Sequence, residues 1–150
     1  MTTDLEALGQ AVKRAQYRNH RTMDAELRDV GVTLVQWDAL RAIDRAPGAS
    51  GHDLAVATFQ SDQSFGTLAT RLVERGLVER SAGRGRRMEH TLTEAGRTAL
   101  ADGHDVAARV LRDLFDPLDE PQRARLSALL TILTEEDAPR RGTGEVSRRP

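Results

Sequence analysis

Two groups of polar side chains in the middle of the chain are of the types that contact nucleic acids. The first combines hydroxyl, amide and guanidinium groups: Ser61, Gln63, Ser64, Thr67, Thr70 and Arg71. The second is the run GRGRR at 83–87, which supplies three guanidinium groups: Arg84, Arg86 and Arg87. Hydroxyl and amide groups can bind base edges in a major groove, and guanidinium groups favour a narrow, electronegative minor groove. Together they predict contacts with double-stranded DNA.

The first group must lie on a helix if its side chains are to reach a groove together. Ser61 suits the N-cap of such a helix, and Gly76 suits its end. A short helix at 51–57, with Ser50 as its N-cap, precedes it across a tight turn. The longer helix is expected to bury its apolar residues, which are Phe65, Leu68, Leu72 and Val73.

The second group belongs to a different kind of element. After Gly76 the pattern changes to two short β-compatible stretches, 77–82 and 88–93, joined by the arginine-rich loop. This predicts a hairpin that carries the three arginines at its tip. Helix, tight turn, helix and hairpin then follow one another in the order of a winged helix-turn-helix.

Further helices flank this unit. A first helix of about 25 residues, roughly over 5–30, would be close to 37 Å long, which exceeds what a compact domain of this size needs, so it is expected to pack on a partner. A second helix starts near Thr33, and another follows Thr93, which suits an N-cap. The last helix starts near Pro121 and has leucines on one face: Leu126, Leu129, Leu130 and Leu133. Residues 138–150 are expected to form a disordered basic tail.

Composition and charge narrow the possible classes of protein. The chain has 150 residues, a net charge of −1 and no cysteine, which excludes disulfides and thiol chemistry. The charge is uneven: residues 71–97 hold seven arginines against four glutamates, whereas 98–137 hold four bases against nine acids. No apolar run approaches a membrane span of about 20 residues, and the N-terminus does not resemble a signal peptide. A cytoplasmic protein that binds no membrane is therefore expected.

Several stretches resemble MarR-type transcriptional regulators. The strongest part of the resemblance is LVERGLVER at 72–80, followed by the arginine loop and by LTEAG at 92–96. The segments 34–40 and 50–54 are similar to the family's second helix and to the start of its third. Several such pieces in the right order and at the right spacing make the resemblance specific, and it covers about residues 5–135.

The resemblance implies a fold and its division. It implies a mainly α protein with a small β-hairpin wing, a winged helix-turn-helix whose N- and C-terminal helices intertwine in a homodimer. One domain would cover 1–137, with dimerisation helices at about 4–30 and 94–135 and the winged helix-turn-helix lobe at about 33–93. The long first helix would then find its partner in the second copy.

The resemblance also implies a function. It implies a sequence-specific, double-stranded DNA-binding regulator, expected to be a repressor that a small aromatic or anionic effector releases from a pseudo-palindromic operator. Arg86 lies where the family keeps its minor-groove wing arginine, six residues before Leu92. Two positions earlier the family usually has an aspartate that braces the wing. Here Arg84 stands instead, and Glu89 is the alternative brace.

Many members of the family bind effectors in a cleft between the dimer helices and the DNA-binding lobe. The candidates for such contacts in this chain are Tyr17, His20, Arg21, Trp37 and Asp38. The competing interpretation places Trp37 in the core and makes His20 and Arg21 part of an exposed helical face.

An enzyme and a protein–protein interaction module are the alternative functions. The pairs His52-Asp53 and His104-Asp105 are adjacent residues, which point in different directions on a helix, and the histidines lack metal-ligand spacing. No enzymatic activity, cofactor or metal is therefore expected. A winged-helix interaction module without a DNA target remains open, because 98–137 is acidic and the net charge is small. The salt dependence of duplex binding separates it from a DNA-binding regulator.

Overall fold

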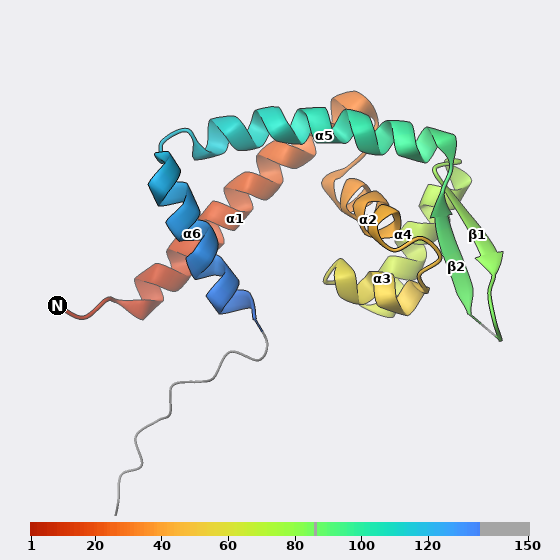
Figure 1. Ribbon diagram of the computed structural model, residues 1–150, viewed down its shortest axis with the longest axis horizontal. Helices are drawn as coiled ribbons and strands as arrows, with labels where there is room; N and C mark the ends of the chain where they lie inside the picture. Colours follow the sequence, from red (N-terminus) through yellow and green to blue (C-terminus); the bar gives the residue numbers. More distant parts are fainter. Residues whose placement is uncertain (86, 136–150) are drawn as a thin grey trace, which may run out of the picture. The chain divides into compact units, whose positions relative to one another are not determined.

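The computed structural model describes residues 1–85 and 87–135, which fall into two compact units, Met1–Leu114 and a second that starts at Phe115. The elements, in chain order, are α1 (Leu5–Leu27), η1 (Arg28–Val30), α2 (Leu34–Arg45), α3 (Gly51–Ala57), α4 (Asp62–Glu74), β1 (Val78–Ala82), β2 (Met88–Leu92), α5 (Glu94–Phe115) and α6 (Glu120–Thr134) (Figure 1). This confirms the predicted winged-helix order. Arg86 and the predicted tail at 138–150 lie outside the described residues. No helix in the described ranges is both long and apolar enough to cross a membrane.

The predicted helix starts are confirmed by their caps. The Ser50 hydroxyl accepts a hydrogen bond from the Asp53 amide at 3.2 Å, and Ser61 caps α4 in the same way at 3.1 Å. Thr93 accepts from the third amide of α5 at 3.0 Å. Each cap satisfies an amide that the first turn of a helix leaves unpaired.

The end of the first helix differs from the prediction. The α-helix stops at Leu27, and residues 28–30 form one 3₁₀ turn before Gly31. Gly31 has φ +82°, a left-handed conformation that glycine adopts without strain, and its amide closes the turn on the Arg28 carbonyl at 3.0 Å. The tighter turn redirects the chain into α2, so the helix ends three residues earlier than its apolar spacing indicates.

The core of the first unit gathers side chains from α1, α2, α4 and α5. Phe65 and Leu72 of α4 are buried as predicted, and Leu68 is partly buried. The expectation for Val73 is wrong, because it is 36% exposed. Val73 follows Leu72 by about 100° of rotation and so leaves the apolar stripe, whereas Ala69 completes it.

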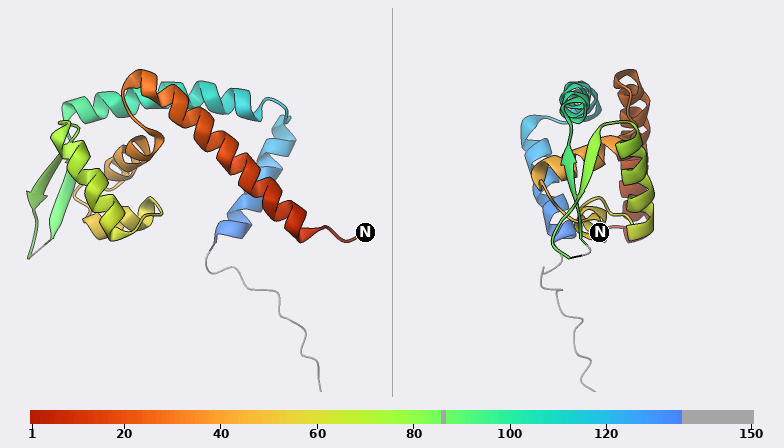
Figure 2. Two further views of the ribbon diagram at one scale, coloured as in Figure 1. Left: turned by 180° about the vertical axis from the view of Figure 1, so that it is seen from behind. Right: turned by 90° about the vertical axis from the view of Figure 1, so that its right-hand side faces the viewer.

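The hairpin is fixed against the start of α3. Its strands pair antiparallel, from Val78 opposite Leu92 to Ala82 opposite Met88 (Figure 2). The His90 carbonyl of β2 accepts from the Gly48 amide at 3.0 Å, and the His90 amide donates to Ala49 at 3.3 Å. The wing therefore lies beside the helix-turn-helix and is held there by backbone bonds.

The run at 72–96 that carries the family resemblance is a junction of three elements. The Thr93 hydroxyl donates to the Gly76 carbonyl at 2.6 Å, and the Thr93 amide donates to Leu77 at 3.1 Å. A Cβ at Gly96 would overlap the Leu77 carbonyl oxygen. The motif thus joins the end of α4, the base of the hairpin and the start of α5, and only glycine fits at position 96.

The second unit contains α6. Asp119 and Gln122 form a capping box, and Pro121 occupies the first turn as predicted. The Arg123 Nε group donates to the Phe115 carbonyl at 3.1 Å. The exposed apolar side chains of α6 are Leu129, Leu130, Ile132 and Leu133.

Candidate nucleic-acid interface

The structure brings the first predicted group together on α4. The cap and the side chains that follow are all exposed: Ser61, Gln63, Ser64, Thr67, Thr70 and Arg71. Gly66 lies among them, and no atom stands within 4 Å of the place of its missing Cβ. The Arg80 guanidinium of β1 donates to the Thr70 hydroxyl at 3.3 Å. The polar face of α4 is therefore open, and Arg80 links it to the wing at Thr70, near the C-terminal end of the helix.

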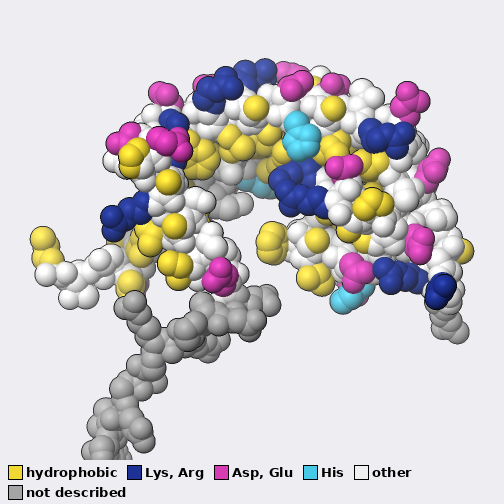
Figure 3. All heavy atoms as spheres, in the orientation of Figure 1, with side chains coloured by type: hydrophobic (Ala, Val, Ile, Leu, Met, Phe, Trp, Pro, Cys, Tyr) yellow, Lys and Arg dark blue, Asp and Glu magenta, His cyan; other side chains and the backbone are white. Residues whose placement is uncertain are grey.

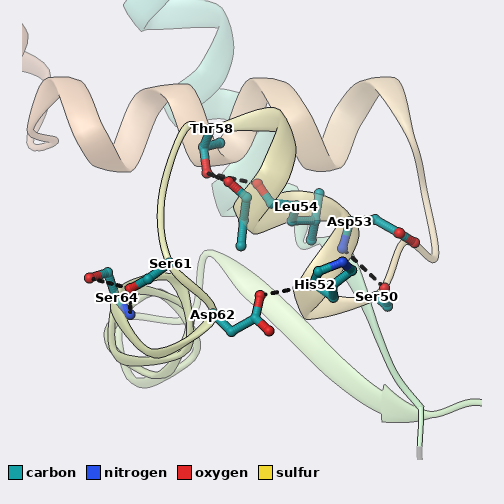
Figure 4. Close-up of polar contacts among 9 residues, drawn as sticks. Ser50, His52, Asp53, Leu54, Thr58, Ser61, Asp62 and Ser64 are labelled. Atoms are coloured by element: carbon teal, nitrogen blue, oxygen red, sulfur yellow. Dashed lines mark hydrogen bonds and ion pairs between the residues drawn. The ribbon is translucent and has the colours of Figure 1, made fainter.

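Sequence reasoning missed a contact at the tip of this face. His52 of α3 and Asp62 in the first turn of α4 are joined at 2.9 Å between Nδ1 and Oδ1 (Figure 4). Both side chains are about 70% exposed, at 71% and 70%. The sequence placed His52 beside Asp53, but its partner lies ten residues away across the turn. A carboxylate therefore stands in the first turn of α4, directly after the Ser61 cap.

The wing arginines differ in their surroundings. Arg84 is exposed at the tip, whereas Arg87 reaches the Asp53 carboxylate of α3 at 3.3 Å. The pKa of Asp53 is lowered, first by the Ser50 hydrogen bonds and further by the charge of Arg87. Glu89 packs against Gly83 at the hairpin turn, because a Cβ added at Gly83 would stand 2.7 Å from the Oε1 atom of Glu89. The described wing is thus tied to α3 through Arg87.

A pocket of about 500 Å³ lies between α1, α2 and α5. The side chains that give it its chemistry are His20, Asn19, Trp37, Asp38, Arg41 and His104. Figure 3 shows histidine and basic side chains next to one another on the face below α5. The volume is within the range of small-molecule sites.

The pocket combines a flat aromatic wall with a cation. The Arg41 guanidinium carbon lies 4.7 Å from the centroid of the Trp37 ring, and the His104 ring packs edge-on against Trp37 at 5.3 Å. The Trp37 indole N–H donates to the Leu100 carbonyl at 3.2 Å, which fixes the ring. Burial raises the pKa of Asp38 against the opposing effect of Arg41. Arg41 Nη1 lies 3.4 Å from Asp38 Oδ1, so an anionic ligand in this pocket would share the guanidinium with Asp38.

The structure divides the residues predicted to contact an effector. His20, Trp37 and Asp38 line the pocket. Tyr17 and Arg21 line a separate hollow along α1, and Tyr17 is 61% exposed.

Sequence reasoning missed other residues of the pocket. Arg41 stands one helical turn after Trp37, so its position was readable from spacing. His104 is far away in sequence and gave no signal. Asn19 also lines the pocket, and its Oδ1 atom is buried without a hydrogen-bond partner among the described residues.

Comparisons with known proteins agree with this architecture. A sequence model of the MarR family matches residues 30–87. The HTH-type transcriptional repressor Rv2887 of Mycobacterium tuberculosis is 28% identical over 113 residues, which cover 74% of this chain and 81% of the relative.

Solved structures are similar over most of the chain. A probable transcriptional regulator of Pseudomonas aeruginosa has a TM-score of 0.76 at 28% identity, over 83% of this chain and 95% of that one. Rv2887 in complex with p-aminosalicylic acid has a TM-score of 0.71 at 26% identity, over 85% and 98%. Escherichia coli MarR bound to operator DNA shares the fold, with a TM-score of 0.81 at 21% identity, over 86% and 94%. The family model over residues 30–87, the repressor relatives and the winged-helix fold together make this chain similar to regulators of the MarR family.

Proposed function

We propose that this chain is a sequence-specific, double-stranded DNA-binding transcriptional repressor that acts as a homodimer. The observation that carries the proposal is the exposed polar face of α4 beside an arginine-bearing hairpin within one compact unit. The similar Rv2887 protein has been solved in complex with DNA, which supports the same ligand here. We further propose that it acts in the cytoplasm, as a regulator rather than as an enzyme.

The α4 face supplies the contacts to the major groove. Gln63 and Thr67 are the base-reading candidates, because the N-terminal half of a recognition helix meets the base edges. Ser61, Ser64 and Arg71 bind phosphate oxygens on either side. The wing arginines, Arg84, Arg86 and Arg87, bind the adjacent minor groove or its phosphates.

A second copy completes the binding surface. Exposed apolar side chains lie on α1 and on α6, at Leu5, Leu8, Val12, Leu129, Leu130 and Leu133. Such side chains cost free energy in water and gain it when a second chain covers them. A two-fold axis would set two α4 helices about 34–36 Å apart on a pseudo-palindromic operator.

A small aromatic anion is the proposed effector. Its ring would pack against Trp37 and His104, and its anionic group would face Arg41. Structures of Rv2887 with salicylic acid and with p-aminosalicylic acid support this chemical class. Binding there would lower the affinity for the operator by shifting α1 and α2.

Selection of bound duplexes followed by binding measurements at several salt concentrations tests the proposal. The affinity should fall steeply with salt, with a slope of about −0.9 per neutralised phosphate. Arg84→Gln should reduce that slope by about one, whereas Arg112→Gln, in the last turn of α5, should leave it unchanged. Salicylate should weaken binding by the wild type more than by Arg41→Gln. Flat salt dependence without sequence preference would instead indicate an interaction module.

A further inference from the structure

Arg75, at the C-terminal end of α4, connects the recognition helix to a distant part of the chain. One guanidinium nitrogen, Nη1, donates to Gln36 Oε1 at 2.9 Å, and the other, Nη2, donates to the Gly31 carbonyl at 2.5 Å. Gly31 lies in the connection between η1 and α2, and Gln36 lies in the first turn of α2. We call residues 31–36 the corner. A single side chain thus joins elements that are about 40 residues apart, at separations of 39 and 44.

The corner is a preformed and rigid acceptor. Gln36 Oε1 also accepts from the Thr33 amide at 3.1 Å, as half of the capping box that starts α2. Gly31 has φ +82°, and this left-handed turn presents its carbonyl to Arg75. A backbone carbonyl and a side-chain oxygen held by the Thr33 amide match the planar fork of a guanidinium, whereas a lysine ammonium is a single point charge.

The same corner forms part of the pocket wall. Leu34, at the start of α2, lines the pocket, and its amide donates to Asp24 Oδ1 of α1 at 2.9 Å. This hydrogen bond is the main cause that lowers the pKa of Asp24. A displacement of α1 against α2 therefore moves the corner, and the corner holds Arg75.

We propose that Arg75 is a positioning residue that sets the angle of α4 for base reading and transmits movements of the pocket wall to it. This inference rests on the proposed function. The 13 residues of α4 span about 20 Å, so a tilt of about 5° at its C-terminal end moves its N-terminal end by about 1.7 Å. Such a shift breaks hydrogen bonds to base edges, which require donor–acceptor distances of about 2.7–3.2 Å. Contacts with phosphates depend mainly on charge and tolerate it.

Arg75→Lys tests the proposal, because it keeps the charge and removes the fork. We expect the affinity for the selected duplex to fall about tenfold, whereas the affinity for a random duplex and the salt slope stay within about twofold. Melting temperatures, measured alongside, should stay close to that of the wild type, because Arg75 is exposed. Arg112→Lys, the same replacement near the end of α5, should change neither affinity.

A double-mutant cycle tests the transmission without any effector. Asp24→Asn weakens the bond to Leu34, and we expect it to lower the ratio of selected to random affinity about threefold in the wild type. In the Arg75→Lys background the same change should have almost no further effect. Gln36→Ala provides a second cycle with the same expectation, should Asp24→Asn fail to fold.

The outcomes separate this inference from the function on which it rests. Additive effects of Asp24→Asn and Arg75→Lys would overturn the inference alone, as would an equal loss of affinity for selected and random duplexes with Arg75→Lys. A wild type that shows no sequence preference would overturn the proposed function and this inference with it.

Discussion

Gly103→Ala should destabilise the protein, because Gly103 of α5 lies against the indole of Trp37. A Cβ at this position would overlap Trp37 Nε1 and Cδ1 and stand 3.0 Å from Cε2. The ring cannot simply rotate away, since Trp37 is 4% exposed and its N–H is bonded to Leu100. Either the indole or the helix must therefore move by about 1 Å to restore ordinary carbon contacts of about 3.5 Å.

The expected magnitude follows from three contributions. Overpacking of a core costs about 1–3 kcal/mol, and the loss of the buried hydrogen bond to Leu100 costs about 1 kcal/mol more. Against these losses, replacing glycine by alanine inside a helix stabilises the folded state by about 1 kcal/mol. Gly103→Ala should thus lower the free energy of unfolding by about 1–3 kcal/mol. This corresponds to about 2–4 °C in Tm for each kcal/mol at this chain length.

Gly66→Ala is the matched control with the opposite sign. Gly66 also lies inside a helix, but no atom stands near its missing Cβ, so the substitution should raise the free energy of unfolding by up to about 1 kcal/mol. Urea unfolding at fixed protein concentration, followed by circular dichroism, measures both. Trp37 is the only tryptophan of the chain, so its fluorescence reports directly on the displaced ring. If Gly103→Ala is as stable as Gly66→Ala and leaves the emission unchanged, the described contact between α5 and Trp37 is incorrect.

The remaining predictions concern pH, base reading and assembly. Burial lowers the pKa of His90 below its ordinary 6.5, so the unfolded chain binds more protons than the folded one. The free energy of unfolding should therefore fall as the pH drops below about 6.5. In His90→Gln, the midpoint of urea unfolding should depend less on pH across that range. Gln63→Ala should relax the preference at one base position at a cost of about 1–3 kcal/mol, and an equal loss on every duplex in a panel would assign Gln63 to phosphate binding. Leu130→Glu, on the exposed face of α6, should yield monomers in sedimentation, and a stable dimer would place the interface elsewhere.

The order of elements was readable from the sequence because its signals are local. Ser50, Ser61 and Thr93 cap the helices that they were expected to cap, since an N-cap depends only on the three or four residues that follow it. The hairpin at 78–92 could be predicted for the same reason, because its two strands are neighbours in the sequence. Val73 was misplaced, because a stripe read at steps of three and four does not show how wide the buried sector is.

The site could be predicted only in part, because its contacts join distant segments. The wall formed by Trp37 and His104 depends on how α5 crosses α2, and the close approach at Gly103 decides that crossing. The contact of His52 with Asp62 depends on the turn between α3 and α4. In that turn Phe59 adopts φ +57°, which its residue type does not indicate.

The ion pair of Arg87 with Asp53 has a consequence for the search along a genome. A wing cation that already has an intramolecular partner gains less from a phosphate, because the bond to Asp53 must be exchanged first. The basic stretch at 71–97 still attracts DNA in general, but Arg87 contributes less to that attraction than an unpaired arginine would. We therefore expect short residence times on non-target DNA and fast sampling of many sites. Long residence times should occur only on sequences whose base contacts compensate for the weaker phosphate contact of Arg87.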